Sequence, residues 1–236
     1  MIDGTFAKRR ARVAGALYLL TVVAGIFAEF FVRGNAVVPN DAAATAHNIL
    51  ASETIYRLGF AADLIGGAAY LALSLILYEL LRRVNETVAL LGLLFSLIGT
   101  AIGAVVGLAH LAPLLLLGGA SYMSAFDTAQ LQALALLALK LHAQGYLISL
   151  AFFGVFEVLF GYLIFKSTFF PRWLGILVAA AGAAFVLNSL LIFTSPAVGR
   201  AVSDYLVYID GIGEIVLMLW LLTVGLNVKQ WDARCA

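Results

Sequence analysis

The amino-acid sequence predicts an all-α integral membrane protein, a six-transmembrane-helix bundle that forms a single domain over residues 1–236. The first observation that supports this prediction is the composition: 64% of the residues are hydrophobic, 11% are charged, and the mean hydropathy is +1.04. Soluble domains are about 45–50% apolar and about 25% charged. The second observation is the length of the apolar stretches, because six of them reach the roughly 20 apolar residues that cross a hydrocarbon core of about 30 Å.

Each of the six stretches is expected to be a helix. They lie at 13–32, 58–81, 88–111, 145–165, 173–193 and 205–226. Inside a bilayer every backbone N–H and C=O must be paired within its own segment, so these runs are helical despite their content of Val, Ile and Phe. The first stretch exceeds the roughly 7–15 apolar residues of a signal peptide and lacks a small-residue cleavage site, which makes it a retained span.

The distribution of basic residues predicts that the N- and C-termini are both cytoplasmic. In that orientation four basic residues face outward, namely Arg33, Arg57, Lys140 and Arg200, which leaves 10 of the 14 Lys and Arg residues inside. Cytoplasmic loops of membrane proteins carry such an excess of Lys and Arg. The lipid bilayer is therefore the expected partner of the chain.

Two short outer-surface helices are expected in the longer connections. Asn40 and Asp41 can cap one of them, and Asp127 can cap another at 131–141 that continues into the fourth span. Connections of this length with their own structure often act as lids or binding elements, although packing caps are more common.

Several classes of protein are disfavoured. The net charge of +1 provides no basic surface for nucleic acid. The single cysteine, Cys235, excludes an internal disulfide and a cysteine-rich metal or redox motif. The sequence has no G-x-S-x-G elbow, no P-loop and no Rossmann fingerprint.

Polar and ionisable side chains lie within the expected spans, where they are costly. At the centre of a span a charged residue costs about 2.5–3.5 kcal/mol on insertion scales, so each one is a candidate functional residue. Counted from the span ends at about 1.5 Å per residue, most of them fall in the outer half of the bilayer. This set consists of Glu29, Asp63, His110, His142, Gln144, Asn188, Asp210 and Glu214. Glu157 lies deeper.

The first interpretation of these residues is a pocket for a metal, a small molecule or a lipid, with intramembrane hydrolysis as one outcome. His and carboxylate side chains bind zinc and other divalent cations. The candidate metal ligands are His110, His142, Asp63 and Asp210. A metal-bound water would be nucleophilic near neutral pH, with Glu214 or Glu29 as the catalytic general base. Asn188, Gln144 and Glu157 complete the pocket. Whether the protein is an enzyme stays open at this stage.

Two other interpretations use the same residues. Carboxylates at stepped depths, among them Asp210 and Glu157, are typical of proton relays, so a proton-coupled transporter of small solutes is the second interpretation. The third is a structural or regulatory membrane protein. In that case the polar side chains hydrogen-bond across helices and hold a Leu- and Ala-rich bundle in register.

Short motifs in the chain resemble a known family. Residues 161–167 read GYLIFKS and residues 171–177 read PRWLGIL, and further matches are R-V-A-G at 12–15 and G-E at 213–214. With these marks the chain resembles the bacterial membrane family catalogued as domain of unknown function 4386. The resemblance covers nearly the whole chain. It implies a single-domain, six-span protein of the bacterial plasma (inner) membrane, and it implies no particular reaction.

Overall fold

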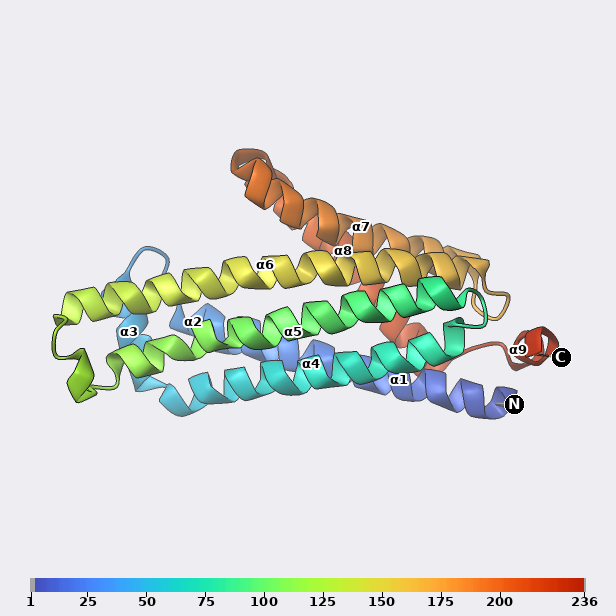
Figure 1. Ribbon diagram of the computed structural model, residues 1–236, viewed down its shortest axis with the longest axis horizontal. Coiled ribbons are helices and arrows are strands. Elements are labelled where there is room, and N and C mark those ends of the chain that lie inside the picture. Colours follow the sequence, from blue (N-terminus) through green and yellow to red (C-terminus); the bar gives the residue numbers. More distant parts are fainter. Residues whose placement is uncertain (1–2, 236) are drawn as a thin grey trace. The chain divides into compact units, whose positions relative to one another are not determined.

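The computed structural model describes residues 3–235, and every regular element within them is a helix (Figure 1). The longer elements are α1 (Gly4–Ile26), α3 (Ala42–Ala51), α4 (Glu53–Leu81), α5 (Glu86–Leu117), α6 (Thr128–Lys166), α7 (Arg172–Thr194), α8 (Pro196–Thr223) and α9 (Val228–Cys235). A π-helical segment, Phe27–Arg33, and the short α2, Gly34–Ala36, continue α1, and a 3-10 turn covers Ser121–Met123.

Six helical segments are long and apolar enough to cross a membrane, which confirms the expected number of candidate spans. They extend beyond the expected limits: the first begins at Gly4 rather than at residue 13, and the sixth begins at Pro196 rather than at residue 205. An apolar stretch marks only the part of a helix that suits lipid. The helix itself continues through polar sequence until a cap or a proline ends it.

The residues expected to form two short helices in the connections are helical, one set as the separate helix α3 and the other as part of α6. Asp41 caps α3, since its carboxylate accepts a hydrogen bond from the Ala44 N–H at 2.9 Å. Asp127 accepts one from the Gln130 N–H at 2.8 Å, and the helix expected at 131–141 is the first part of the 39-residue α6. At about 1.5 Å per residue, a helix of this length is roughly 58 Å long. It therefore exceeds a hydrocarbon core of about 30 Å.

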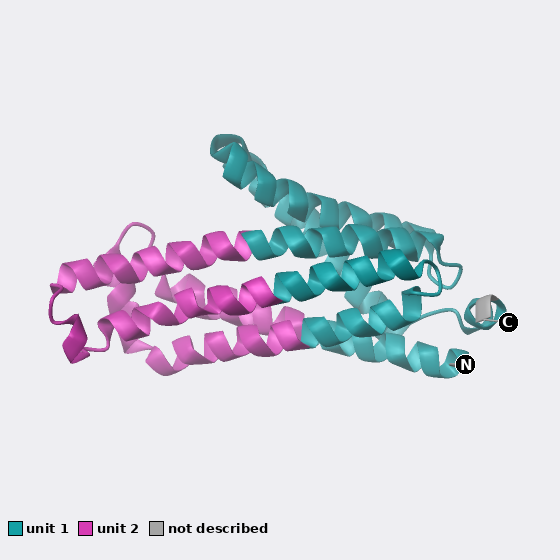
Figure 2. Ribbon diagram, in the orientation of Figure 1, with its two compact units in different colours: residues 1–19, 69–100, 148–236 teal, residues 20–68, 101–147 magenta. Residues whose placement is uncertain are grey.

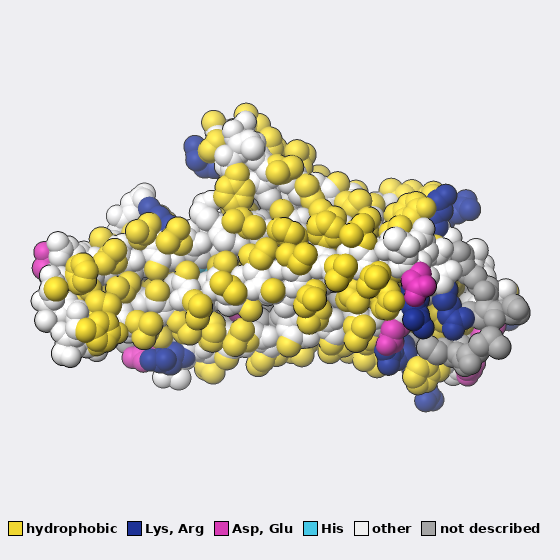
Figure 3. All heavy atoms as spheres, in the orientation of Figure 1, with side chains coloured by type: hydrophobic (Ala, Val, Ile, Leu, Met, Phe, Trp, Pro, Cys, Tyr) yellow, Lys and Arg dark blue, Asp and Glu magenta, His cyan; other side chains and the backbone are white. Residues whose placement is uncertain are grey.

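Large apolar side chains cover much of the exposed helix surface (Figure 3). On α5 alone, Val105, Leu108 and Leu115 are 63–67% exposed. Exposed apolar surface on this scale is unfavourable in water and costs nothing against lipid tails. The surface therefore agrees with the apolar composition in indicating a membrane protein.

The residues group into two compact units (Figure 2). Unit 1 comprises the chain up to Leu19, Ala69–Thr100 and the chain from Ile148 onward, and unit 2 comprises Leu20–Ala68 and Ala101–Leu147. The boundaries fall within α1, α4, α5 and α6, so each of these helices contributes to both units.

Helix packing in unit 2 depends on glycine. A Cβ atom at Gly145 of α6 would lie 2.4 Å from a methyl carbon of Val106 on α5, and one at Gly107 of α5 would lie 2.9 Å from the Phe60 ring on α4. Small residues at such positions let membrane helices approach closely. These contacts hold α4, α5 and α6 around one polar cluster.

Glycine also permits close contacts between helices in unit 1. A Cβ atom at Gly182 of α7 would lie 2.4 Å from the Gly154 carbonyl oxygen on α6, and one at Gly15 of α1 would lie 2.5 Å from the Leu222 nitrogen on α8. Both contacts involve backbone atoms, which cannot move aside as a flexible side chain can. They hold α1 to α8 and α6 to α7, the helices that carry a second polar cluster.

Candidate functional site

The structure gathers the predicted site residues into two clusters, one in each unit. Asp63, His110 and His142 form the first, here named the histidine triad, and Glu157, Asp210 and Glu214 form the second, the carboxylate triad. Within each triad one ligand atom of every residue lies within 4.8 Å of those of the other two. Asp210 was expected beside the histidines, and the structure places it instead with the two glutamates.

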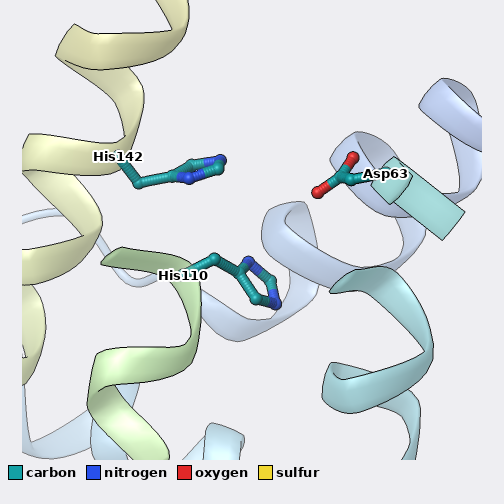
Figure 4. Close-up of side chains that lie close together, drawn as sticks. All are labelled: Asp63, His110 and His142. Carbon is teal, nitrogen blue, oxygen red and sulfur yellow. The ribbon is translucent and has the colours of Figure 1, made fainter. Parts of the chain in front are cut away.

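The histidine triad draws one side chain from each of three helices. Asp63 lies on α4, His110 on α5 and His142 on α6, and the three side chains point into the same space (Figure 4). Both histidines are buried, whereas the Asp63 side chain is 26% exposed. The triad is thus accessible from the side of its carboxylate.

Backbone carbonyl groups fix the orientation of both imidazole rings. His110 Nε2 lies 3.1 Å from the Tyr56 carbonyl oxygen, and His142 Nδ1 lies 3.1 Å from the Val106 carbonyl oxygen. A carbonyl oxygen only accepts, so these two nitrogens carry the hydrogen in the neutral rings. The lone pairs consequently remain on His110 Nδ1, which is buried without a hydrogen-bond partner, and on His142 Nε2.

Tyr56 adds a second restraint on His110. Its ring stacks on the imidazole with 4.2 Å between centroids, and its hydroxyl donates a 2.6 Å hydrogen bond to the His110 carbonyl oxygen. The two residues therefore exchange hydrogen bonds, each to the other's backbone carbonyl. Nothing in the position of Tyr56 along the sequence indicates a partner on the third span.

A buried arginine holds the carboxylate of the triad. Arg33 donates from Nη1 to Asp63 Oδ2 at 2.6 Å and from Nη2 to Asp63 Oδ1 at 3.2 Å, and its Nε binds Glu29 Oε2 at 2.7 Å. Each Asp63 oxygen keeps a further lone pair, since a carboxylate offers about four acceptor sites. One guanidinium between two carboxylates leaves a single negative charge beside the neutral histidines.

Arg33 is a site residue that sequence reasoning misses. The sequence presents it as a basic residue flanking the first span, whereas its side chain is buried in the structure. It ends the π-helical segment Phe27–Arg33, and single π-helical turns are frequent at functional sites. The available signal is the spacing of Glu29 and Arg33, four residues apart, which favours an ion pair on one helix face.

The carboxylate triad combines α6 and α8. Asp210 and Glu214 lie one turn apart on α8, Glu157 lies on α6, and the Tyr18 hydroxyl of α1 donates a 3.0 Å hydrogen bond to Glu214 Oε1. Gly182 of α7 lies against the Cβ atom of Glu157. Both carboxylate oxygens of Glu157 and the Oδ1 atom of Asp210 are buried without a hydrogen-bond partner.

The remaining predicted residues lie outside both triads. Asn188 is buried on α7, with its Oδ1 atom unpartnered, and Gln144 is exposed on α6, two residues beyond His142. Of the two candidate general bases, Glu214 belongs to the carboxylate triad, and Glu29 is 57% exposed and bound to Arg33. Glu29 is therefore one ion pair away from the Asp63 carboxylate.

Taken together, the six long apolar helices indicate a multi-pass helical membrane protein, and two clusters of polar side chains lie on these helices. The chain belongs to the family described as domain of unknown function (DUF4386), whose profile matches residues 13–225. This match confirms the resemblance seen in the short motifs of the sequence.

Part of the chain is also similar to an archaeal protein. An uncharacterized protein of Archaeoglobus fulgidus is 30% identical over 79 residues, which make up 34% of this chain and 45% of the relative. The match thus spans less than half of that relative's length. No solved structure matches the chain.

Proposed function

We propose that this chain is a multi-pass membrane protein that binds a divalent transition-metal cation, with zinc as the best match, at the histidine triad. The observation that carries the proposal is the pair of carbonyl hydrogen bonds that leaves one lone pair on each imidazole beside Asp63. Metal-binding histidines almost always donate their other ring N–H to a carbonyl or carboxylate group.

The donor set supports zinc over harder ions. Two imidazoles and one carboxylate are ligand types that zinc accepts, and three protein ligands leave the fourth tetrahedral position open. The lone negative charge left around Arg33 favours a cation. The unpartnered Nδ1 atom of His110 also supports a ligand, because buried polar atoms are rarely left without a partner.

An open position on zinc is compatible with the hydrolytic activity expected from the sequence. A water bound there would be acidified by the cation and would become a nucleophile near neutral pH. Glu29 is the candidate general base in the same unit, since its carboxylate shares Arg33 with Asp63. A membrane-embedded hydrolase acting on lipids or small amides is thus the enzymatic form of the proposal.

The chain supplies its own control for a test of metal binding. The third histidine, His47, is exposed on α3 and belongs to neither triad. Full-length protein is purified in mild detergent without chelator, supplied with zinc, freed of excess ion and analysed by mass spectrometry. We expect about one zinc per chain in wild type and in His47→Ala, and a loss of most of it in His142→Ala and Asp63→Asn.

Either of two results would contradict the proposal. One is a wild-type protein that retains no zinc after loading. The other is a zinc content that is the same in wild type, His142→Ala and Asp63→Asn. Asp63→Asn keeps the size of the side chain, so it separates a lost ligand from a lost fold.

We further propose that the protein resides in a bacterial plasma membrane with both termini in the cytoplasm. The excess of basic residues on that side supports this orientation. In this arrangement the connection that contains α3 faces outward.

A further inference from the structure

Glu157 is an unusual side chain for the interior of a membrane helix bundle. It is 3% exposed, and neither of its carboxylate oxygens has a hydrogen-bond partner. It lies within reach of Asp210 and Glu214, which are themselves carboxylates and offer no obligatory donor. Since buried polar groups are nearly always paired, Glu157 requires either a bound cation or protons shared with the neighbouring carboxyl groups.

Among the side chains that the structure describes, no basic group is placed to neutralise the triad. The ion pairs that the described residues form lie elsewhere, at Arg10 with Glu79, Arg33 with Asp63 and Glu29, and Arg57 with Glu53. Along α6 the next basic residue is Lys166, nine residues and about 13 Å of helix from Glu157. Along α8 it is Arg200, ten residues and about 15 Å from Asp210.

The described basic residues of the other packed helices also lie apart from the triad. Arg12 of α1 lies six residues from Tyr18, and its guanidinium donates to the Thr223 carbonyl oxygen. Arg172 of α7 lies ten residues from Gly182, the residue that contacts Glu157. Three carboxyl groups in a medium of low dielectric constant repel one another strongly unless a cation or bound protons neutralise them.

The donor atoms of this triad differ in kind from those of the histidine triad. All three side chains are carboxylates, and the Tyr18 hydroxyl donates a hydrogen bond to Glu214. Oxygen-only sites suit Mg²⁺, Ca²⁺ and Mn²⁺. Their bonds of about 2.0–2.6 Å place opposite ligands about 4–5 Å apart, and the ligand atoms of the triad lie within 4.8 Å of one another.

We propose that Glu157, Asp210 and Glu214 form a second, separate cation site that binds a hard divalent cation of the Mg²⁺, Ca²⁺ and Mn²⁺ class. The site belongs to unit 1 and shares no residue with the histidine triad. It does not depend on zinc binding, so either site can exist without the other.

Electron paramagnetic resonance with Mn²⁺ as the probe tests this second site. Purified full-length protein in detergent, first treated with chelator and then freed of it, is titrated with Mn²⁺ while the signal of the free ion is recorded. We expect about one bound Mn²⁺ per chain in wild type, displaced by Ca²⁺ or Mg²⁺. Glu157→Gln and Asp210→Asn, which keep side-chain size, are expected to weaken binding at least tenfold.

Three controls distinguish the proposal from its competitors. Glu53→Gln removes an exposed carboxylate that pairs with Arg57 outside the triad, and it should bind Mn²⁺ as wild type does. His142→Ala should lose zinc and retain Mn²⁺, so failure of one site is distinguishable from failure of the other. Tyr18→Phe removes only the hydroxyl on Glu214, and a smaller loss of affinity is expected.

Two outcomes would overturn the second site. The first is a wild-type protein that binds none of the three ions, especially if infrared spectra show a protonated carboxyl band that disappears in Glu157→Gln. In that case protons neutralise the triad. The second is Mn²⁺ binding that stays unchanged in both Glu157→Gln and Asp210→Asn.

Discussion

At the scale of single residues, the histidine triad is defined by hydrogen bonds made away from the proposed metal position. One ring nitrogen of each histidine, His110 and His142, hydrogen-bonds to a backbone carbonyl oxygen, and the guanidinium of Arg33 binds the Asp63 carboxylate. A ligand set restrained in this way loses little conformational freedom when a cation binds. The same restraints predict which substitutions affect stability and which affect metal binding alone.

Arg33 is expected to stabilise the fold as well as the site. Arg33→Leu leaves Asp63 and Glu29 without their shared cation, and we expect the free energy of unfolding to fall by about 2 kcal/mol. Fully buried pairs lose about 3–5 kcal/mol, and the smaller figure reflects side chains that are 26% and 57% exposed. Unfolding by SDS titration, followed by circular dichroism, measures the change.

Arg57 provides the matched control for Arg33. It pairs with Glu53 four residues away, and its side chain is 59% exposed. Exposed pairs of this kind contribute about 0.3–0.5 kcal/mol, so Arg57→Leu should leave the unfolding free energy nearly unchanged. Equal effects of the two substitutions would mean that Arg33 does not hold the histidine triad together.

Residue types could be predicted from the sequence, whereas their grouping could not. Polar side chains in apolar spans identify His110, His142 and Asp63 as candidates because each is costly in lipid. Distances from span ends assign depth but not rotation about the helix axis or the choice of neighbouring helix. For that reason the prediction from sequence places Asp210 with the histidines, whereas the structure places it with Glu157 and Glu214. The prediction also assigns no role in the site to Arg33.

At the scale of helices, the hydropathy of the sequence predicts the number of candidate spans, but it does not predict where each helix begins and ends. Apolar length fixes how many segments suit lipid, which is why six stretches correspond to six long helices. Helix ends depend on caps, prolines and packing against neighbours. No simple sequence signal predicts the π-helical segment Phe27–Arg33. Its last residue, Arg33, is the one that binds Asp63.

Close helix contacts at glycine predict a specific sensitivity to added methyl groups. Gly182→Ala on α7 would place a Cβ atom 2.4 Å from the Gly154 carbonyl oxygen. Overpacking of this kind costs about 1–3 kcal/mol, and it also pushes α7 away from Glu157. A lowered melting temperature in detergent is the expected result.

A glycine on the next helix serves as the control for this contact. Gly211 of α8 has no atom within 4 Å of its Cβ position, and alanine in a helix is favoured over glycine by about 0.5–1 kcal/mol. Gly211→Ala should therefore keep or raise the melting temperature. If Gly182→Ala and Gly211→Ala melt alike, the contact between α6 and α7 is looser than the structure shows.

At the scale of the whole molecule, the proposed orientation makes a direct prediction about topology. Green fluorescent protein fused after residue 236 should fluoresce, because it folds in the cytoplasm. Alkaline phosphatase fused within α3, at Ala42–Ala51, should be active, since that enzyme requires the oxidising side of the membrane. The reverse pattern would place the termini outside and contradict the orientation inferred from the basic residues.

Two separate cation sites of different chemistry would make the molecule responsive to two classes of ion. The histidine triad offers nitrogen and oxygen donors, and the carboxylate triad offers oxygen alone. Zinc and the harder ions therefore need not compete for the same ligands. Family membership sets no reaction for either site, so the ligands of bound metal are the first fact to establish.

X-ray absorption at the zinc edge of the purified, zinc-loaded protein identifies the atoms around the metal, and it therefore tests whether zinc binds at the histidine triad. We expect two imidazole ligands and additional oxygen ligands around zinc in wild type, with zinc–nitrogen distances of about 2.0–2.1 Å, and little bound zinc in His142→Ala. A wild-type spectrum without imidazole scattering, or a zinc signal of the same strength and shape in His142→Ala, would contradict zinc binding at the histidine triad.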